Sequence, residues 1–224
     1  MKGKAIPMDM VEKLSNCDEA IWRKKVFGPI WDRSGIDPDD ANELLCKFKK
    51  IIDKLGIKYW LTYGTALGFY RDGDFIPWDD DIDSHLDAHQ MLEVGLEKIK
   101  KEFMAEGIVV RCKDRGLNSK FSLFYKAVKM QMQGVYEEND TMHTKLFHYP
   151  AKFYKNRQQF EYRGNMYFLP GPPDEYLAFC YDENWREPKD IKNWQDYMNP
   201  AQLKDSTWRA EYNLHSRGVL KKGE

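Results

Sequence analysis

Hydrophobic and polar positions in the first part of the chain follow a helical spacing and then a strand spacing. Residues 38–55 carry apolar side chains three and four positions apart, which places them on one stripe of a helix. Asp37 is suited to cap this helix, Pro38 to occupy its first position and Gly56 to end it. Residues 57–61 then have the composition of a short strand.

The next stretch predicts a tight turn and a second strand followed by a helix. The turn at residues 63–65 leads into a short helix expected over 66–70. Residues 80–86 predict a strand, and Asp87 is suited to cap a helix over 88–106. The side chains expected on the inward face of that helix are Leu92, Leu96, Ile99 and Phe103.

Strand patterns dominate the following part of the chain. Residues 158–170 predict a β-hairpin with its tip at 164–165, and the prolines at 172–173 open a helix over 174–182. Helices and strands alternate first and strands cluster later, which favours an α+β protein with a mixed β-sheet flanked by helices over a doubly wound fold. The three strands expected before the hairpin are 108–112, 120–126 and 128–136.

These patterns divide the chain into three parts. Residues 1–36 mix charged and large apolar side chains, which predicts an N-terminal arm packed on the core. Residues 37–190 hold the regular helix and strand patterns and are predicted to form the main domain. Residues 191–224 carry two weaker amphipathic segments and predict a C-terminal helical tail.

Composition is that of a globular protein with a polar surface. Hydrophobic residues make up 42% and charged residues 32%, and the net charge of -1 gives no overall field for nucleic acid. No apolar run approaches the roughly 18 residues of a membrane span. The N-terminus has no signal-peptide pattern, so we expect a cytoplasmic protein without a transmembrane segment. The four scattered cysteines predict reduced, mostly buried thiols.

The strongest chemical feature is the segment WDDDID, with four aspartates among five positions. Side chains alternate along a strand, so Asp79, Asp81 and Asp83 are expected on one face, with Asp80 and Ile82 on the other. Neighbours on one face lie roughly 7 Å apart at Cβ, and their oxygens can converge on one hard cation. Mg²⁺ or Mn²⁺ prefers such ligands. We therefore predict a metal site on Asp81 and Asp83.

Three alternatives compete with a metal site. A solvated acidic loop is the common one, but Pro77 and Trp78 are expected to be buried and to confine the acids. An EF-hand loop beginning at Asp79 would have Ser84 and Gln90 where glycine and glutamate are needed, which excludes it. A helix cap needs fewer acidic residues than this segment contains.

The turn Tyr63-Gly64-Thr65 is a candidate phosphate site. Glycine allows the backbone to approach a ligand closely, and N–H groups at the start of a helix bind phosphate. Arg71 lies between this turn and the aspartates and is placed to pair with a phosphate oxygen. An ordinary ion pair with one of the two aspartates that follow it is the alternative.

Together these segments resemble a known family. LTYGTALG, then Arg71, then FIPWDDDID are similar to the signature of the LicD/fukutin family, and FEYRGNMYFLPGPPDEYLAFCYDENWREP resembles its second block. The resemblance implies the nucleotidyltransferase fold of DNA polymerase beta. It matches Gly64-Thr65 to the phosphate-binding turn of that fold and Asp81 and Asp83 to its metal ligands, with Asp79 as an additional acid.

The activity implied by the resemblance is transfer of a phospho-alcohol, such as phosphocholine or phosphoribitol. The donor would be a CDP-activated alcohol and the acceptor a glycan or glycolipid hydroxyl. Mg²⁺ or Mn²⁺ on Asp81 and Asp83 would bridge the donor's diphosphate, and Asp79 would act as base or orienting group. Two alternatives stay open, a nucleotidyltransferase that moves NMP from an NTP and an inactive nucleotide-binding homologue.

Some side chains are weaker candidates for the same site. Tyr63 or Trp60 could stack on the donor's base, although a core position is the more common role of each. Lys120 and Lys126, on a facing strand, could touch phosphate. Zinc is not expected, because His85 and His89 straddle the end of a strand and the start of a helix.

One departure from the family pattern concerns a third carboxylate. The fold implied by the resemblance carries this acid on a later strand, between apolar residues. The local counterpart is Met130-Gln131-Met132, in which glutamine replaces the acid. Glu137 or Glu138 is the candidate substitute. If neither reaches the metal, the general base or a ligand of a second metal is missing.

Overall fold

The computed structural model describes residues 3–26, 28–31, 35–188, 199 and 202. The chain divides into two compact units, one formed by residues 1–136 and 159–169 and the other by residues 137–158 and 170–224. The tail predicted over 191–224 lies outside the described residues except at Asn199 and Gln202. The domain boundaries expected from the sequence stay a prediction.

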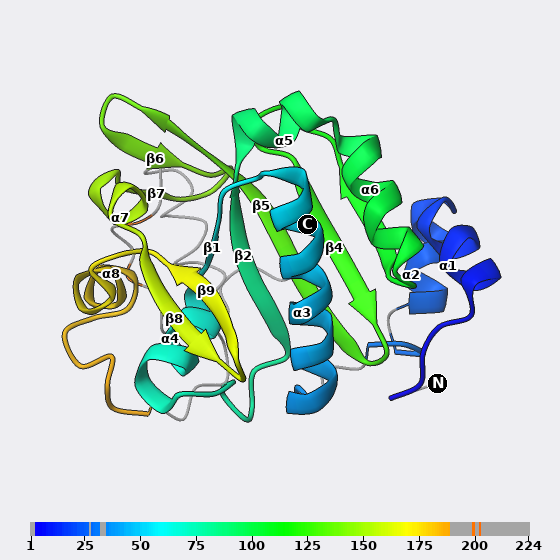
Figure 1. Ribbon diagram of the computed structural model, residues 1–224, viewed down its shortest axis with the longest axis horizontal. Helices are drawn as coiled ribbons and strands as arrows, with labels where there is room; N and C mark the ends of the chain where they lie inside the picture. Colours follow the sequence, from blue (N-terminus) through cyan, green and yellow to red (C-terminus); the bar gives the residue numbers. More distant parts are fainter. Residues whose placement is uncertain (1–2, 27, 32–34, 189–198, 200–201, 203–224) are drawn as a thin grey trace, which may run out of the picture. The chain divides into compact units, whose positions relative to one another are not determined.

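Five strands of a mixed sheet form the centre of the first unit (Figure 1). Their order is β1-β2-β5-β4-β3. β2 and β5 are parallel, and the other neighbours are antiparallel. This mixed sheet with flanking helices confirms the α+β class. The strands are β1 (Tyr59–Leu61), β2 (Asp81–Asp87), β3 (Val109–Lys113), β4 (Lys120–Tyr125) and β5 (Val128–Glu138), whose last two residues belong to the second unit.

Helix α3 (Pro38–Leu55) lies across one face of this sheet (Figure 1). Asp37 caps it by accepting hydrogen bonds from the backbone N–H groups of Asp39 and Asp40 at 3.1 and 3.0 Å. Such a cap is worth about 1 kcal/mol. Gly56 ends the helix in the left-handed region, at φ 70°. The predicted helix and both of its ends are confirmed. Its buried apolar stripe includes Leu44, Leu45, Phe48, Ile51 and Ile52.

The helix predicted over 88–106 is broken in two at Gly95, which has φ 91°. Because the two halves pack separately, the first half buries Met91 and leaves Leu92 40% exposed, so the predicted inward position of Leu92 is wrong. The second half buries Ile99 as expected. The two helices are α5 (Ala88–Val94) and α6 (Leu96–Ala105).

The N-terminal residues pack on the sheet through one hydrophobic cluster. This cluster joins them to Val109 of β3 and Phe124 of β4. The rings of Trp22 and Trp31 meet the ring of Phe124 edge-on, with centroid distances of 5.3 and 6.1 Å. These residues are therefore part of the core of the first unit. The helices in this segment are α1 (Met8–Ser15) and α2 (Glu19–Val26).

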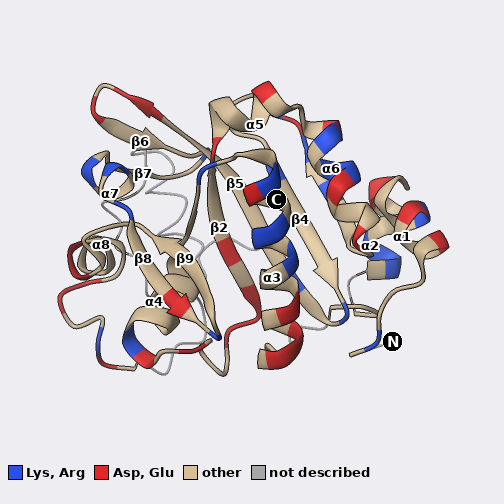
Figure 2. Ribbon diagram, in the orientation of Figure 1, with Lys and Arg blue, Asp and Glu red and all other residues tan. Residues whose placement is uncertain are grey.

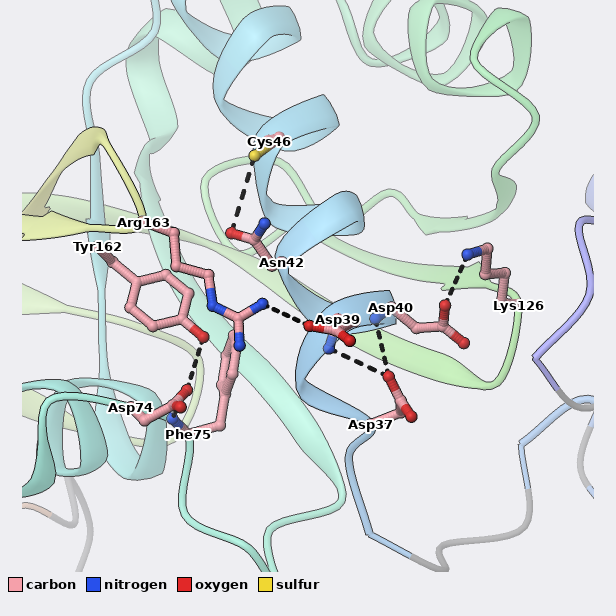
Figure 3. A network of polar contacts seen from close by, with 10 residues as sticks. All are labelled: Asp37, Asp39, Asp40, Asn42, Cys46, Asp74, Phe75, Lys126, Tyr162 and Arg163. Atoms are coloured by element: carbon pink, nitrogen blue, oxygen red, sulfur yellow. Dashed lines mark hydrogen bonds and ion pairs between the residues drawn. The ribbon is translucent and has the colours of Figure 1, made fainter.

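The predicted hairpin is present and closes the first unit. Its turn residues Arg163 and Gly164 have φ of 45° and 79°, one position earlier than expected. Figure 3 shows two contacts that hold the hairpin. The hydroxyl of Tyr162 donates to Asp74 at 2.6 Å, and the guanidinium of Arg163 pairs with Asp39 at 2.7 Å. The strands are β8 (Gln158–Tyr162) and β9 (Asn165–Leu169).

The second unit has an aromatic core. The ring centroids of Tyr149, Phe153, Tyr176 and Phe179 lie 5.7 to 6.3 Å apart in the contacting pairs. Trp185 is 2% exposed and Tyr176 is fully buried. Three of the elements here were not predicted, because three or four residues are too few to show a periodicity. The elements are β6 (Thr141–His143), β7 (His148–Pro150), α7 (Lys152–Lys155) and α8 (Pro173–Cys180).

Candidate active site

The start of β2 and the residues just before it are rich in acidic residues, coloured red in Figure 2. Carboxylate oxygens of Asp79, Asp80 and Asp81 lie within 4.8 Å of one another. β2 begins at Asp81, so the alternation of a strand does not extend back to Asp80. Asp80 lies in the same cluster as Asp79 and Asp81, and the prediction that it lies on the opposite face is wrong. Ile82 is fully buried as expected, and Asp83 shares the face of Asp81.

Gly64 is required because the side chain of Asp79 lies directly against it. A Cβ atom at this position would stand 2.2 Å from Oδ2 of Asp79. The other carboxylate oxygen, Oδ1, accepts a hydrogen bond from the backbone N–H of Asp80 at 2.9 Å. The start of helix α4 (Tyr63–Asp72) and the carboxylate of Asp79 are therefore close enough to contact one ligand.

Hydrogen bonds on both sides of Asp83 fix the turn to β2. The backbone N–H of Asp83 donates to Oγ1 of Thr65 at 2.9 Å, and its carbonyl accepts from the backbone N–H of Thr62 at 3.0 Å. Tyr63 has φ 50°, and its ring meets the ring of His85 edge-on at 5.2 Å. The structure thus brings the predicted phosphate turn beside the predicted metal ligands.

Burial and mutual repulsion raise the pKa of two carboxyl groups. Burial raises the pKa of Asp79 to about 7, and the charge of Asp81 contributes further. The pKa of Asp83 lies well above its ordinary value, first through burial and then through the charges of Asp81 and Asp79. A divalent cation would offset this penalty. A donor set made of carboxylate oxygens therefore fits Mg²⁺ or Mn²⁺.

Two side chains of β5, Lys129 and Gln131, contact Asp81. In the parallel pairing, Lys129 lies opposite Asp81 and Gln131 opposite Asp83. The ammonium of Lys129 donates to Oδ2 of Asp81, and Nε2 of Gln131 donates to the same oxygen at 2.7 Å. The lysine ammonium also lies 4.2 Å from the centroid of the Trp31 ring. Lys129 was not predicted, although its place two residues before Gln131 on one strand face could have indicated it.

Comparison with known proteins identifies the family. Residues 56–172 match the family model described as LicD/FKTN/FKRP, nucleotidyltransferase domain. This range is just over half of the 224-residue chain and includes the turn, the aspartates and both β5 side chains. The chain belongs to the LicD/FKTN/FKRP family.

Its relatives include transferases and an uncharacterized protein. Human ribitol-5-phosphate transferase FKTN is 26% identical over 187 residues, covering 73% of this chain and 36% of FKTN. Mouse ribitol 5-phosphate transferase FKRP is 48% identical over 33 residues, covering 15% of this chain and 7% of FKRP. An uncharacterized protein of Rickettsia typhi is 30% identical over 122 residues, covering 50% of this chain and 38% of that protein. The chain thus spans little more than a third of FKTN.

In this LicD/FKTN/FKRP chain, Gln131 stands on the strand where the resemblance leads us to expect a third carboxylate. Of the two candidate substitutes, Glu137 forms an ion pair with a lysine and Glu138 is exposed. The carboxylate of Glu137 pairs with Lys155 at 2.8 Å, and Glu138 is exposed at the end of β5. At the position that the resemblance assigns to this acid, the chain thus carries a neutral hydrogen-bond donor.

The two lysines expected near phosphate have different surroundings. Lys120 of β4 is partly buried, and burial lowers its pKa while the nearby charge of Asp83 opposes that shift. Lys126 instead pairs with Asp40 and Glu43 of α3, at 2.6 and 2.7 Å (Figure 3 shows the first of these pairs). Of these two lysines, Lys120 is therefore the one whose charge interacts with Asp83 of the acidic cluster.

Arg71 forms the ion pair that was considered as its alternative role. Its Nε and Nη2 donate to the two carboxylate oxygens of Asp72 at 2.9 and 2.7 Å. The Arg71 side chain is 8% exposed, whereas that of Asp72 is 39% exposed. The alternative role is confirmed, and the phosphate contact of Arg71 stays a prediction.

Aromatic residues near the site differ from the expectation. Trp60 is 4% exposed and belongs to the core. Pro77 and Trp78 were expected to be buried, but both are exposed, and Trp78 is 62% exposed. The burial falls on Phe75 and Ile76 instead. A run of apolar residues does not by itself indicate which of its members face solvent.

The structure also bears on the predictions about the cysteines and about membrane-spanning segments. All four cysteines are free thiols, as the sequence predicted, but only Cys180 is buried, so the prediction of mostly buried thiols is wrong. Within the described ranges, no helix is both long enough and apolar enough to cross a membrane.

Proposed function

We propose that this chain carries the catalytic domain of a transferase that moves a phospho-alcohol from a CDP-linked donor to a glycan hydroxyl. Family membership supports the transferase class, and the relatives FKTN and FKRP are named for ribitol 5-phosphate. A phosphoribitol group is therefore the first candidate and phosphocholine the second. The nucleotidyltransferase fold and the metal dependence are parts of this proposal.

The observation that carries the proposal is the acidic cluster against Gly64 at the start of α4. Burial, and after it the charges of neighbouring aspartates, raise the pKa values of Asp79 and Asp83, so their ionised forms are costly without a cation. Asp81 and Asp83 would hold Mg²⁺ or Mn²⁺, which when bound supplies positive charge against the donor's diphosphate. Backbone N–H groups at the start of α4 would bind phosphate oxygens beside it.

The chemical step is an in-line displacement at phosphorus. The acceptor oxygen forms a bond to the phosphorus that carries the alcohol, while the bond from that phosphorus to the CMP oxygen breaks. CMP leaves with the electron pair of the broken bond. Asp79 would accept the proton of the acceptor hydroxyl, because a carboxyl group with a pKa of about 7 is partly in its basic form near neutral pH.

Product analysis tests this function. The chain would be incubated with Mg²⁺, CDP-ribitol or CDP-choline and a panel of glycans, with an Asp83→Asn variant as the matched control. CMP release together with a phospho-alcohol on the glycan, lost in the variant, is the expected result. Pyrophosphate released from an NTP would instead support nucleotidyl transfer. Donor binding without product for every acceptor would support an inactive homologue.

A further inference from the structure

One oxygen of Asp81 is fully occupied by two donors from β5. A carboxylate oxygen offers two lone pairs, and Oδ2 accepts one hydrogen bond from the Lys129 ammonium and one from Nε2 of Gln131. Because an ionised carboxylate only accepts hydrogen bonds, the amide of Gln131 must present its NH₂ group there. Oδ1 is the oxygen of Asp81 that remains for another ligand.

Packing and hydrogen bonds hold both donors in place. Lys129 is 9% exposed, and its ammonium lies over the Trp31 ring. The indole N–H of Trp31 donates to the backbone carbonyl of Asp80 at 2.9 Å, which ties this ring to the acidic segment. On the other donor, the backbone carbonyl of Gln131 accepts from the hydroxyl of Ser84 in β2 at 3.1 Å. Packing therefore holds the Lys129 ammonium, and the Ser84 hydrogen bond holds the backbone of Gln131, beside the aspartates.

We propose that Lys129 and Gln131 are positioning residues that limit the aspartate site to one divalent cation. Two ions in a catalytic pair lie about 3.5–4 Å apart, and a carboxylate that bridges them gives one oxygen to each. Asp81 does not bridge while its Oδ2 is occupied. This inference rests on the metal dependence that is part of the proposed function.

Charge supports the same conclusion. Position 131 lies opposite Asp83 and supplies a neutral amide where a carboxylate would add a negative oxygen. Lys129 places a positive charge against Asp81, where a second cation would otherwise be attracted. Both features lower the affinity for a second ion and leave the first ion with Asp83 and Oδ1 of Asp81.

Counting bound Mn²⁺ tests the inference without any assay of transfer. The full chain would be titrated with Mn²⁺, with free ion measured by electron paramagnetic resonance and affinity by calorimetry. The wild-type chain is expected to bind one ion and Gln131→Glu to bind two. Lys129→Met, which keeps an unbranched side chain against Trp31, is expected to bind the first ion at least tenfold more tightly.

Lys126→Met is the matched control. It removes the same charge from a lysine that pairs with Asp40 and Glu43 instead, and its affinity is expected to stay within twofold of the wild-type value. Lys129→Arg retains the positive charge and is expected to resemble the wild-type chain. Circular dichroism verifies that each variant is folded. If Lys129→Met does not fold, Gln131→Glu still provides the test.

The outcomes separate this inference from the proposed function. Two ions bound by the wild-type chain, or one ion bound by Gln131→Glu, would overturn the inference and leave the proposed transferase intact. Equal affinities of Lys129→Met and Lys126→Met would do the same. No Mn²⁺ binding by the wild-type chain or any variant would overturn both.

Discussion

Asparagine substitutions at Asp79 and Asp81 should change the stability of the metal-free protein in opposite directions. Both remove one negative charge from the same cluster. Asp79 is ionised at a cost, because burial and the charge of Asp81 raise its pKa to about 7. Asp81 is held by the ammonium of Lys129. We therefore expect Asp79→Asn to stabilise the fold at pH 8 and Asp81→Asn to destabilise it.

The magnitude for Asp79 follows from its pKa. The ordinary value is 3.8 and the folded value is about 7, a difference of about three units at about 1.4 kcal/mol each. The folded chain holds the proton of Asp79 more tightly than the unfolded chain, so protonation stabilises the fold by the full amount below pH 3.8. This stabilisation is lost as the pH rises through about 7. Ionised Asp79 thus costs at most about 4 kcal/mol at pH 8 and close to nothing at pH 4.

Asp81→Asn leaves Lys129 without its charged partner. The side chains of Asp81 and Lys129 are 12% and 11% exposed, so the ammonium is poorly solvated once the carboxylate is gone. Removing one member of a buried ion pair typically costs about 3–5 kcal/mol. In contrast, Asn at position 79 keeps an oxygen that can accept the backbone N–H of Asp80.

Guanidinium denaturation in the presence of EDTA at pH 4, 6 and 8 measures both effects as free energies of unfolding. The advantage of Asp79→Asn over the wild-type chain should grow from under about 1 kcal/mol at pH 4 to as much as about 4 kcal/mol at pH 8. In thermal melts, each kcal/mol corresponds to about 2–4 °C for a chain of this size. An advantage that does not vary with pH, or a more stable Asp81→Asn, would refute this reasoning.

Three further substitutions test the site and its support. Gly64→Ala should weaken Mn²⁺ binding at least fivefold in calorimetry, because a Cβ 2.2 Å from Oδ2 of Asp79 displaces the negative charge of that carboxylate from the cluster, while the melting temperature should change little. Unchanged affinity would contradict this. Trp78→Ala should change the unfolding free energy by less than about 0.5 kcal/mol in urea denaturation, since this side chain is 62% exposed; a larger loss would show that the indole packs against the fold. Tyr162→Phe loses the hydrogen bond to Asp74 and should cost about 1 kcal/mol in urea denaturation, and no loss would show that this contact does not stabilise the hairpin.

Elements with local signals were predicted well. α3 was predicted to both ends because Asp37, the apolar spacing and Gly56 act within a few residues of the positions they control. The hairpin at 158–170 was predicted for the same reason, through a turn that favours positive φ. The prediction failed where neighbours outside the segment decide, as at Trp78, whose exposure depends on what packs around it.

The sequence by itself determined which residues are candidates for the chemistry. The glycine turn, the run of aspartates and the glutamine between two methionines are properties of residue order, so their spacing alone indicated an oxygen-ligand site near a phosphate turn. Only the tertiary structure decided that Asp80 joins the cluster and that Lys129, 48 positions from Asp81, occupies one of its oxygens. The reason is physical. The register of β2 against β5 is set by long-range pairing and burial, and no local pattern specifies which side chains that register places opposite one another.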